Sequence, residues 1–333
     1  MRFYLFIFIA IGFVSDLQAQ LLPTFGNSRT GASGMQFLKI MPDARSSAMA
    51  GSVAGFTKDP SAMFWNPSGI AVGDSAKASF FFSNTRYAAS NSANFIGLTY
   101  KTGSLSTLGL QVISMNYAPM EETTEFQPMG TGRMVNLSNT LIGLTYAKIL
   151  TDNFSFGLSS KWAHEGIGDV RINNFLFDLG LTYDIGIKHS RFGVAFTNFG
   201  LNVSPDGEVN MLNLSGDVVK TSFGEVSAPG MFRIGGAFDP IHSKTQVLTF
   251  TAQLNHPTDN NETFSVGAEY GYKRLLFARS GWEFGSDEAY AFPTAGLGIR
   301  LPRKFGDFRF DYSLVSKTRM GNMQRLSLLF NLR

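Results

Sequence analysis

Asp307-Phe-Arg-Phe-Asp-Tyr-Ser-Leu314 alternates charged or small side chains with large apolar ones. Because successive side chains of a strand point to opposite faces of a sheet, this period of two predicts a strand with one polar and one apolar face. The same alternation recurs in 154–162 and 175–183. From about residue 77 to residue 333 the chain therefore reads as one long series of strands.

About fourteen strand candidates follow residue 77, most of them near the 9 to 11 residues, roughly, that span a membrane when tilted. They are 77–84, 93–101, 106–116, 139–149, 153–164, 174–186, 190–199, 230–239, 246–256, 262–271, 274–282, 292–300, 306–314 and 322–333. Tight connections alternate with mostly longer ones such as 165–173, and 117–138 and 200–229 are the longest. Short turns at one end and longer loops at the other are typical of bacterial outer-membrane barrels.

Periodicity alone does not choose between a barrel and a soluble β-sandwich, whose strands also alternate. The loop asymmetry favours an all-β transmembrane barrel of about 14 antiparallel strands, with outer-membrane lipid around it. A soluble periplasmic sandwich stays open as an alternative.

The composition agrees with a lipid-facing surface. Hydrophobic residues make up 44% of the chain, aromatic residues 14% and charged residues only 16%, against roughly 25% charged residues in ordinary soluble domains. The net charge is +3, but Lys and Arg are scattered singly, so we expect no nucleic-acid partner. The chain has no Cys, which excludes disulfides and thiolate chemistry.

The N-terminus has the pattern of a signal peptide. Met1-Arg-Phe-Tyr-Leu-Phe-Ile-Phe-Ile-Ala-Ile-Gly-Phe-Val14 places one basic residue before a short apolar run. Leu17-Gln-Ala19 supplies a small residue before the expected cleavage point, so we predict a signal peptide over 1–19. The predicted localisation is the outer membrane.

Residues 37–71 are unlike the strands, because small residues dominate them at helical spacing. A first helix is expected to begin at Pro42-Asp43, and Asp59 or Ser61 to cap a second one that ends at Asn66-Pro67. Many glycines on the inner strand faces leave room for such a segment. We therefore predict a helical plug over 20–76 inside a barrel over 77–333. The plug residues singled out are Pro42, Asp43, Arg45, Trp65, Asn66 and Pro67. Asp43 and Arg45 are expected to pair with charges on the barrel wall, and Trp65-Asn-Pro-Ser68 to form the closing turn of the plug.

Two plug segments resemble the N-terminal pattern of the PorV/PorQ family of outer-membrane proteins. They are Phe37-Leu-Lys-Ile-Met-Pro-Asp-Ala-Arg-Ser-Ser-Ala-Met-Ala-Gly51 and Phe64-Trp-Asn-Pro-Ser-Gly-Ile-Ala71. That family is similar to the FadL group of fatty-acid transporters, fourteen-stranded barrels with an N-terminal hatch. Two departures stand out: Ser68 replaces the usual Ala of an Asn-Pro-Ala motif, and Met49-Ala-Gly51 replaces Met-Gly.

The resemblance implies one of two non-enzymatic activities. PorV-like members act in type IX secretion, where they bind the C-terminal domains of secretion cargo and the translocon or attachment proteins. FadL-like relatives bind a hydrophobic ligand in the lumen and release it sideways into the membrane. The first activity is our main prediction, and the transporter is the alternative.

The connection 117–138 and the residues beside it are apolar for exposed sequence. Exposed apolar surface marks binding sites, and Met adapts to varied partners. We therefore predict a partner- or ligand-binding loop, while simple folding of these residues onto the rim stays open. The residues concerned are Met115, Met120, Phe126, Met129 and Met134.

The sequence offers no strong sign of catalytic or metal chemistry. None of the four His has metal-ligand spacing with another His or a carboxylate. His164 and His256 are expected at the extracellular rim, where a Ser-His pair stays open as an alternative. Rim His are usually solvated, so we expect no enzyme, no metal and no cofactor.

Overall fold

The computed structural model describes residues 33–73, 76–87, 91–123, 125–212, 218–286 and 290–332. The predicted signal peptide and its cleavage point after Ala19 lie outside these residues. Within them, no helix is both long and apolar enough to cross a membrane.

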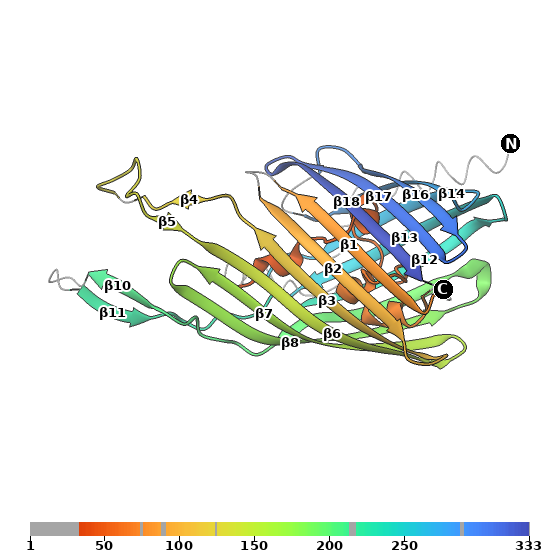
Figure 1. Ribbon diagram of the computed structural model, residues 1–333, viewed down its shortest axis with the longest axis horizontal. Coiled ribbons are helices and arrows are strands. Elements are labelled where there is room, and N and C mark those ends of the chain that lie inside the picture. Colours follow the sequence, from red (N-terminus) through yellow and green to blue (C-terminus); the bar gives the residue numbers. More distant parts are fainter. Residues whose placement is uncertain are drawn as a thin grey trace, which may run out of the picture.

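Fourteen antiparallel strands close into a barrel, as predicted, and each predicted strand has its counterpart (Figure 1). The barrel closes between the first and last strands, where Ala78 pairs with Leu332 and Arg86 with Gln324. Two short hairpins, β4–β5 (Met120–Glu121, Met134–Val135) and β10–β11 (Glu208–Leu212, Val218–Ser222), extend from two long loops. The barrel strands are β1 (Ala78–Arg86), β2 (Ser92–Lys101), β3 (Ser106–Asn116), β6 (Leu137–Thr151), β7 (Phe154–Ile167), β8 (Val170–Asp184), β9 (Arg191–Gly200), β12 (Met231–His242), β13 (Gln246–Pro257), β14 (Thr263–Tyr272), β15 (Leu276–Phe284), β16 (Thr294–Arg303), β17 (Gly306–Lys317) and β18 (Gly321–Leu332).

The alternation of the sequence becomes an inside and an outside. In β17, Phe310 and Tyr312 are exposed, whereas Asp311 and Ser313 between them are buried. Every barrel strand exposes at least one large apolar side chain in this way. A closed barrel with an apolar exterior fits a lipid bilayer, because closure leaves no unpaired strand edge in the hydrocarbon. The fold is therefore a transmembrane barrel of the outer-membrane type.

Tight turns and long loops lie at opposite ends, and we name the tight-turn end periplasmic and the other end extracellular. The two longest predicted loops are found, since they carry the β4–β5 and β10–β11 hairpins. The predicted loop 165–173 is wrong: β7 runs to Ile167 and β8 begins at Val170. Polar residues there suggested a loop, but a strand that leaves the bilayer needs only a pairing partner, not apolar side chains.

Within residues 33–73, the described part of the predicted plug, the helical segments are single turns rather than full helices. They are η2 (Gln36–Lys39), α2 (Ala44–Ala48), α3 (Ala62–Trp65) and η3 (Pro67–Ile70). Asp43 caps α2 as predicted, since its carboxylate accepts a hydrogen bond from the Ser46 backbone at 2.7 Å. Asn66 ends α3 immediately before Pro67, also as predicted. At the start of α3 the N-cap is Ser61, whose own backbone N–H donates to Asp59.

The plug lies inside the barrel, because it bonds to inward-facing residues around the wall (Figure 1). These contacts run from Ala44 N to Ser327, from Ser47 to Ser313, from Thr294 to the Ala48 carbonyl, from Ser52 to Thr251, from Ala54 N to Gln253, and from Asn66 to the Leu181 carbonyl. They involve β18, β17, β16, β13 and β8, so the plug is held from several sides.

Candidate functional site: the plugged lumen

Asp43 and Trp65, which lie in different segments of the plug, contact each other. The Trp65 indole N–H donates to the Asp43 carboxylate at 2.8 Å, and both side chains are buried. Burial raises the pKa of Asp43 above its usual value, an effect that nearby Asp59 reinforces. Asp43 thus fixes the plug internally, whereas the sequence suggested that it would pair with a charge on the barrel wall.

Arg45 makes the predicted link between plug and wall. Its guanidinium donates two hydrogen bonds to Glu269 of β14, at 2.8 Å and 2.7 Å. Glu269 also accepts from Arg279 of β15 at 2.6 Å, and Arg279 reaches Asp311 at 2.7 Å. Buried charges are costly unless they are paired, and this chain of ion pairs satisfies that condition.

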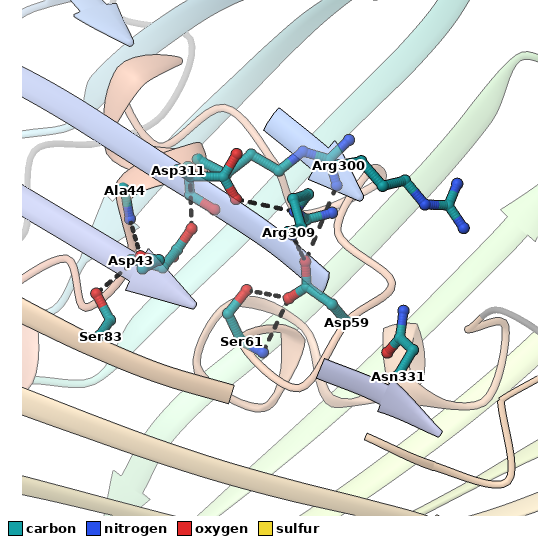
Figure 2. A network of polar contacts seen from close by, with 12 residues as sticks. Asp43, Ala44, Asp59, Ser61, Ser83, Arg300, Arg309, Asp311 and Asn331 are labelled. Carbon is teal, nitrogen blue, oxygen red and sulfur yellow. Dashed lines mark hydrogen bonds and ion pairs between the residues drawn. The ribbon is translucent and has the colours of Figure 1, made fainter. Parts of the chain in front are cut away.

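A second link joins Asp59 of the plug to Arg309 of β17, which also donates to Asp311 at 2.8 Å (Figure 2). Burial alone would raise the pKa of Asp59, but Arg309 and Arg45 hold it below the usual value. The Asp59 carboxylate is therefore ionised at neutral pH, tied to the wall by Arg309 and lying close to Arg45 of the plug itself.

Asn66 and Pro67 seat the plug against the opposite wall. The Asn66 amide donates to the carbonyls of Ala54 at 2.8 Å and Leu181 at 3.0 Å. Its oxygen accepts from the Ser68 hydroxyl at 2.7 Å. Gly180 of β8 makes this approach possible, because a Cβ there would lie 2.1 Å from the Asn66 oxygen. The role of Asn66-Pro67 as a closing turn stays a prediction, but its contacts agree with that role.

Below the plug, a cavity of 330 Å³ opens at the periplasmic end of the lumen. Nine Lys and Arg residues line it against four Asp and Glu residues. Several are tied to each other, such as Arg300, which donates to Asp307 with both contacts at 3.0 Å. The excess of positive charge gives this vestibule a preference for anions over apolar molecules.

Above the plug, the extracellular half of the lumen is apolar on one side. Inward residues of β2, β3, β6, β7 and β8 form this chamber, which is defined by Ala93, Phe95, Ile113, Met115, Leu141, Ala163, Ile172 and Leu176. Met35, Phe37 and Leu38 of the strap, residues 33–41, fill it and are at most 3% exposed. The chamber wall is unusual because barrel interiors are ordinarily polar.

Polar contacts near the extracellular loops hold the strap in place. The Met35 N–H donates to Glu165 at 2.5 Å, and the Lys39 ammonium lies 2.6 Å from Asp259. Ser33 also bonds to Asp259, and Gln36 donates to it at 2.9 Å. Burial would raise the pKa of Asp259, but Lys39 and its other donors lower it. The strap is therefore fastened at the mouth of the barrel.

The predicted binding loop divides into two parts. Phe126 and Met129 are 93% and 94% exposed, and Met120 and Met134 are exposed on the β4–β5 hairpin. Met115 is not a loop residue: it lies near the end of β3, is buried, and belongs to the apolar chamber. The sequence groups Met115 with the loop although it lies within the predicted strand 106–116, because only the structure shows that its side chain points into the lumen.

Within the residues that the structure describes, no group of three His, Asp or Glu side chains is arranged to hold a metal ion. His256 contacts Glu262 at 3.0 Å on the extracellular side, and His242 contacts Asp239 at 3.1 Å on the periplasmic side.

No protein-family model matches this chain, and no curated protein matches its sequence. Solved structures do match. The Ralstonia pickettii toluene transporter TbuX has a TM-score of 0.59 at 13% identity, over 87% of this chain and 98% of its own. The Pseudomonas putida toluene transporter TodX has a TM-score of 0.59 at 11% identity, over 86% and 96%. A Pseudomonas aeruginosa FadL homologue has a TM-score of 0.55 at 12% identity, over 87% and 97%.

The fold and its filled lumen define a plugged transmembrane β-barrel, in agreement with the predicted localisation in an outer membrane. More particularly, the barrel is FadL-like, as the similarity to the FadL homologue shows over most of both chains. At these identities the likeness concerns the fold alone. None of these three structures is described as a PorV or PorQ protein, so that finer resemblance stays a prediction.

Proposed function

We propose that this barrel binds hydrophobic small molecules in the apolar chamber and passes them across the outer membrane. This was the alternative at the level of sequence, and it takes precedence here over a role in type IX secretion. The observation that carries it is the apolar wall of the extracellular half of the lumen. The toluene transport named for TbuX and TodX fits a barrel of this shape.

The strap shows what kind of surface the chamber accepts. Three side chains, Met35, Phe37 and Leu38, occupy it without any polar partner for their side-chain ends. Burying apolar area gains roughly 25 cal/mol for each Å², so a ligand of similar area would compensate for displacing them. The polar contacts that hold the strap lie at the mouth, on Glu165 and Asp259, where a ligand would arrive.

The floor of the chamber is charged, which limits how far an apolar ligand can descend. Lys161 of β7 pairs with Asp178 of β8, and both are buried. Arg233 of β12 donates to Thr197 at 2.8 Å in the same layer. An apolar ligand would gain nothing beyond this layer, so we place its binding site above the plug.

The test is ligand binding to the full-length protein in nanodiscs, with a fluorescent long-chain fatty acid as probe and toluene as competitor. Ile113→Asp puts a charge into the chamber and should lower the probe's affinity. Phe37→Ala should raise it, because truncating a buried Phe weakens the strap by about 3 kcal/mol. Phe80→Ala, on the lipid-facing side of β1, is the control. Absence of saturable binding, or a fall in affinity with Phe37→Ala, would contradict the proposal.

A second candidate is the type IX role, which one observation favours. The β4–β5 hairpin and its tip expose Met120, Phe126, Met129 and Met134 together, and such surface suits a protein partner. Gene deletion tests it: secretion of proteins with the type IX signal domain should fall, and shortening residues 122–133 alone should reproduce the loss. Unchanged secretion would remove this candidate and leave the first untouched.

A further inference from the structure

Three polar side chains meet on the outer face of the barrel near its extracellular end. The Ser138 hydroxyl of β6 lies 3.4 Å from His164 Nε2 of β7. His164 Nδ1 lies 2.9 Å from the Asn173 side-chain oxygen of β8. With the proton on Nδ1, His164 donates to Asn173 and leaves Nε2 free to accept from Ser138. The three residues therefore form a hydrogen-bonded triad of a serine, a histidine base and an amide that orients the histidine ring.

Strand register places these residues, since 35 positions separate the first from the last. His164 pairs with Thr140 on one side and with Asn173 on the other. Ser138 pairs with Gly166. We call each set of outward residues paired across neighbouring strands a row, so Ser138 lies one row nearer the extracellular end than His164. Because strand residues alternate in direction, all of these side chains share the outward face. The sequence suggested a rim histidine, but only the register shows which serine and which amide reach it.

The arrangement has the parts that nucleophilic catalysis needs. A serine is activated when a base accepts its proton, and the base is effective when a third group fixes its ring. The 3.4 Å contact is longer than a normal hydrogen bond, and such contacts are often longer before substrate binds. Ser138 and Asn173 are exposed and His164 is partly exposed, so a substrate can reach them.

Gly166 makes room for the Ser138 hydroxyl itself, and it is buried beneath that side chain. A Cβ on Gly166 would lie 2.6 Å from the Ser138 hydroxyl. The next residue in the row of Ser138 is Arg171 of β8, which is exposed on the same face. A guanidinium two strands away can stabilise negative charge that develops above Gly166.

The depth of the group in the membrane indicates its substrate. One row nearer the bilayer centre, Ile142, Trp162 and Phe175 pair across the same three strands. The Trp162 ring stacks on His164, with ring centres 5.8 Å apart and an interplanar angle of 17°. Aromatic girdles mark the boundary between hydrocarbon and headgroups. Lipid acyl esters lie at this boundary.

We propose that Ser138, His164 and Asn173 form a hydrolase site for acyl esters of lipids in the outer leaflet. Ser138 Oγ attacks the ester carbonyl carbon while its proton passes to His164 Nε2. The ester C–O bond then breaks, and the same proton goes to the leaving alcohol. Water attacks the acyl-serine through His164, which releases a fatty acid and restores the hydroxyl. Asn173 is a positioning residue that holds the ring.

The test uses the full-length chain folded in nanodiscs, with heat-modifiable migration as the measure of folding. A fluorophosphonate probe should label the wild type, and Ser138→Ala should abolish labelling and release of fatty acid. Ser160→Ala is the matched control, because Ser160 is exposed on the same face of β7 and has no His beside it in the register. Vesicles of phosphatidylethanolamine and of lipid A, each with labelled acyl chains, identify which lipid supplies the ester.

His164→Ala should lower kcat by on the order of 10²-fold or more. Asn173→Ala should lower kcat with little change in KM, and Asn173→Asp should restore much of it, which a purely structural role would not produce. The proposal is overturned if folded wild type neither reacts with the probe nor releases fatty acid from either lipid. It is equally overturned if Ser138→Ala retains the activity.

Discussion

The seat of the plug against β8 can be tested with a single methyl group. In Gly180→Ala the new Cβ would lie 2.1 Å from the Asn66 oxygen and 2.7 Å from Pro67 Cδ. Both distances are more than 0.5 Å below ordinary contact, so the turn at Asn66-Pro67 must move away. The turn cannot shift sideways along the wall, because it also packs on neighbouring Gly157, where a Cβ would lie 2.4 Å from the Pro67 backbone.

The magnitude follows from the contacts that this movement breaks. Overpacking a filled interior costs about 1–3 kcal/mol. Pulling the Asn66 amide from the Leu181 carbonyl, a 3.0 Å contact, leaves a buried group unpaired at about 1–3 kcal/mol more. We expect docking of the plug to weaken by about 3 kcal/mol, which corresponds to roughly a 100-fold larger undocked population.

Hydrogen exchange measured by mass spectrometry reports that population. Amides of α2 and α3 should exchange about 100-fold faster in Gly180→Ala, because local opening controls their exchange. Amides of β16 to β18 should keep the wild-type rate. Gly236→Ala is the control, since its only close neighbour would be the Arg191 carbonyl at 3.4 Å. If the plug amides exchange at the same rate in both variants, the plug does not depend on this contact and the reasoning is wrong.

Three further results are expected. Burial opposes ionisation of Asp59, but Arg309 lowers the pKa of this carboxyl below its usual value. The ionised carboxylate therefore stabilises the plug fully above the usual carboxyl pKa of about 4, and this stabilisation is lost as the pH falls through the lowered pKa. Protection factors of the plug amides, which correct for the pH dependence of intrinsic exchange, should therefore fall on acidification below about pH 4 in the wild type and less in Asp59→Asn, and identical profiles would contradict this. Asp259→Asn should free Lys39, so that strap amides exchange faster while those of α2 do not; protection unchanged in the strap would show that its apolar side chains suffice. Met129→Ser should change thermal stability by less than about 0.5 kcal/mol, because the side chain is 94% exposed, and a larger loss in a thermal scan would place it in the folded core.

Much of the barrel could be predicted because a membrane imposes a simple rule on each strand. The alternation of Phe310, Asp311 and Tyr312 needs no knowledge of neighbours, since lipid faces every outward residue. The N-cap at Asp43 and the helix end at Asn66-Pro67 are equally local, because they depend on residues within one turn. These predictions are confirmed for that reason.

Other features depend on register, which connects residues that are distant in sequence. Glu269 meets Arg45, Asp43 turns to Trp65, and Met115 joins the apolar chamber only once the strands are paired and the plug is seated. The loop over 165–173 was mispredicted because pairing between β7 and β8 outlasts the apolar pattern.

By itself, the sequence determined the approximate strands, favoured a barrel over a sandwich, and showed a small-residue segment expected to lie inside the barrel. Only the tertiary structure decided how the lumen is divided, with an apolar chamber above the plug and a positively charged vestibule below it. It also brought Ser138, His164 and Asn173 together on the outer face. The physical reason is that alternation assigns each residue to a face, whereas strand register alone assigns its neighbours on that face.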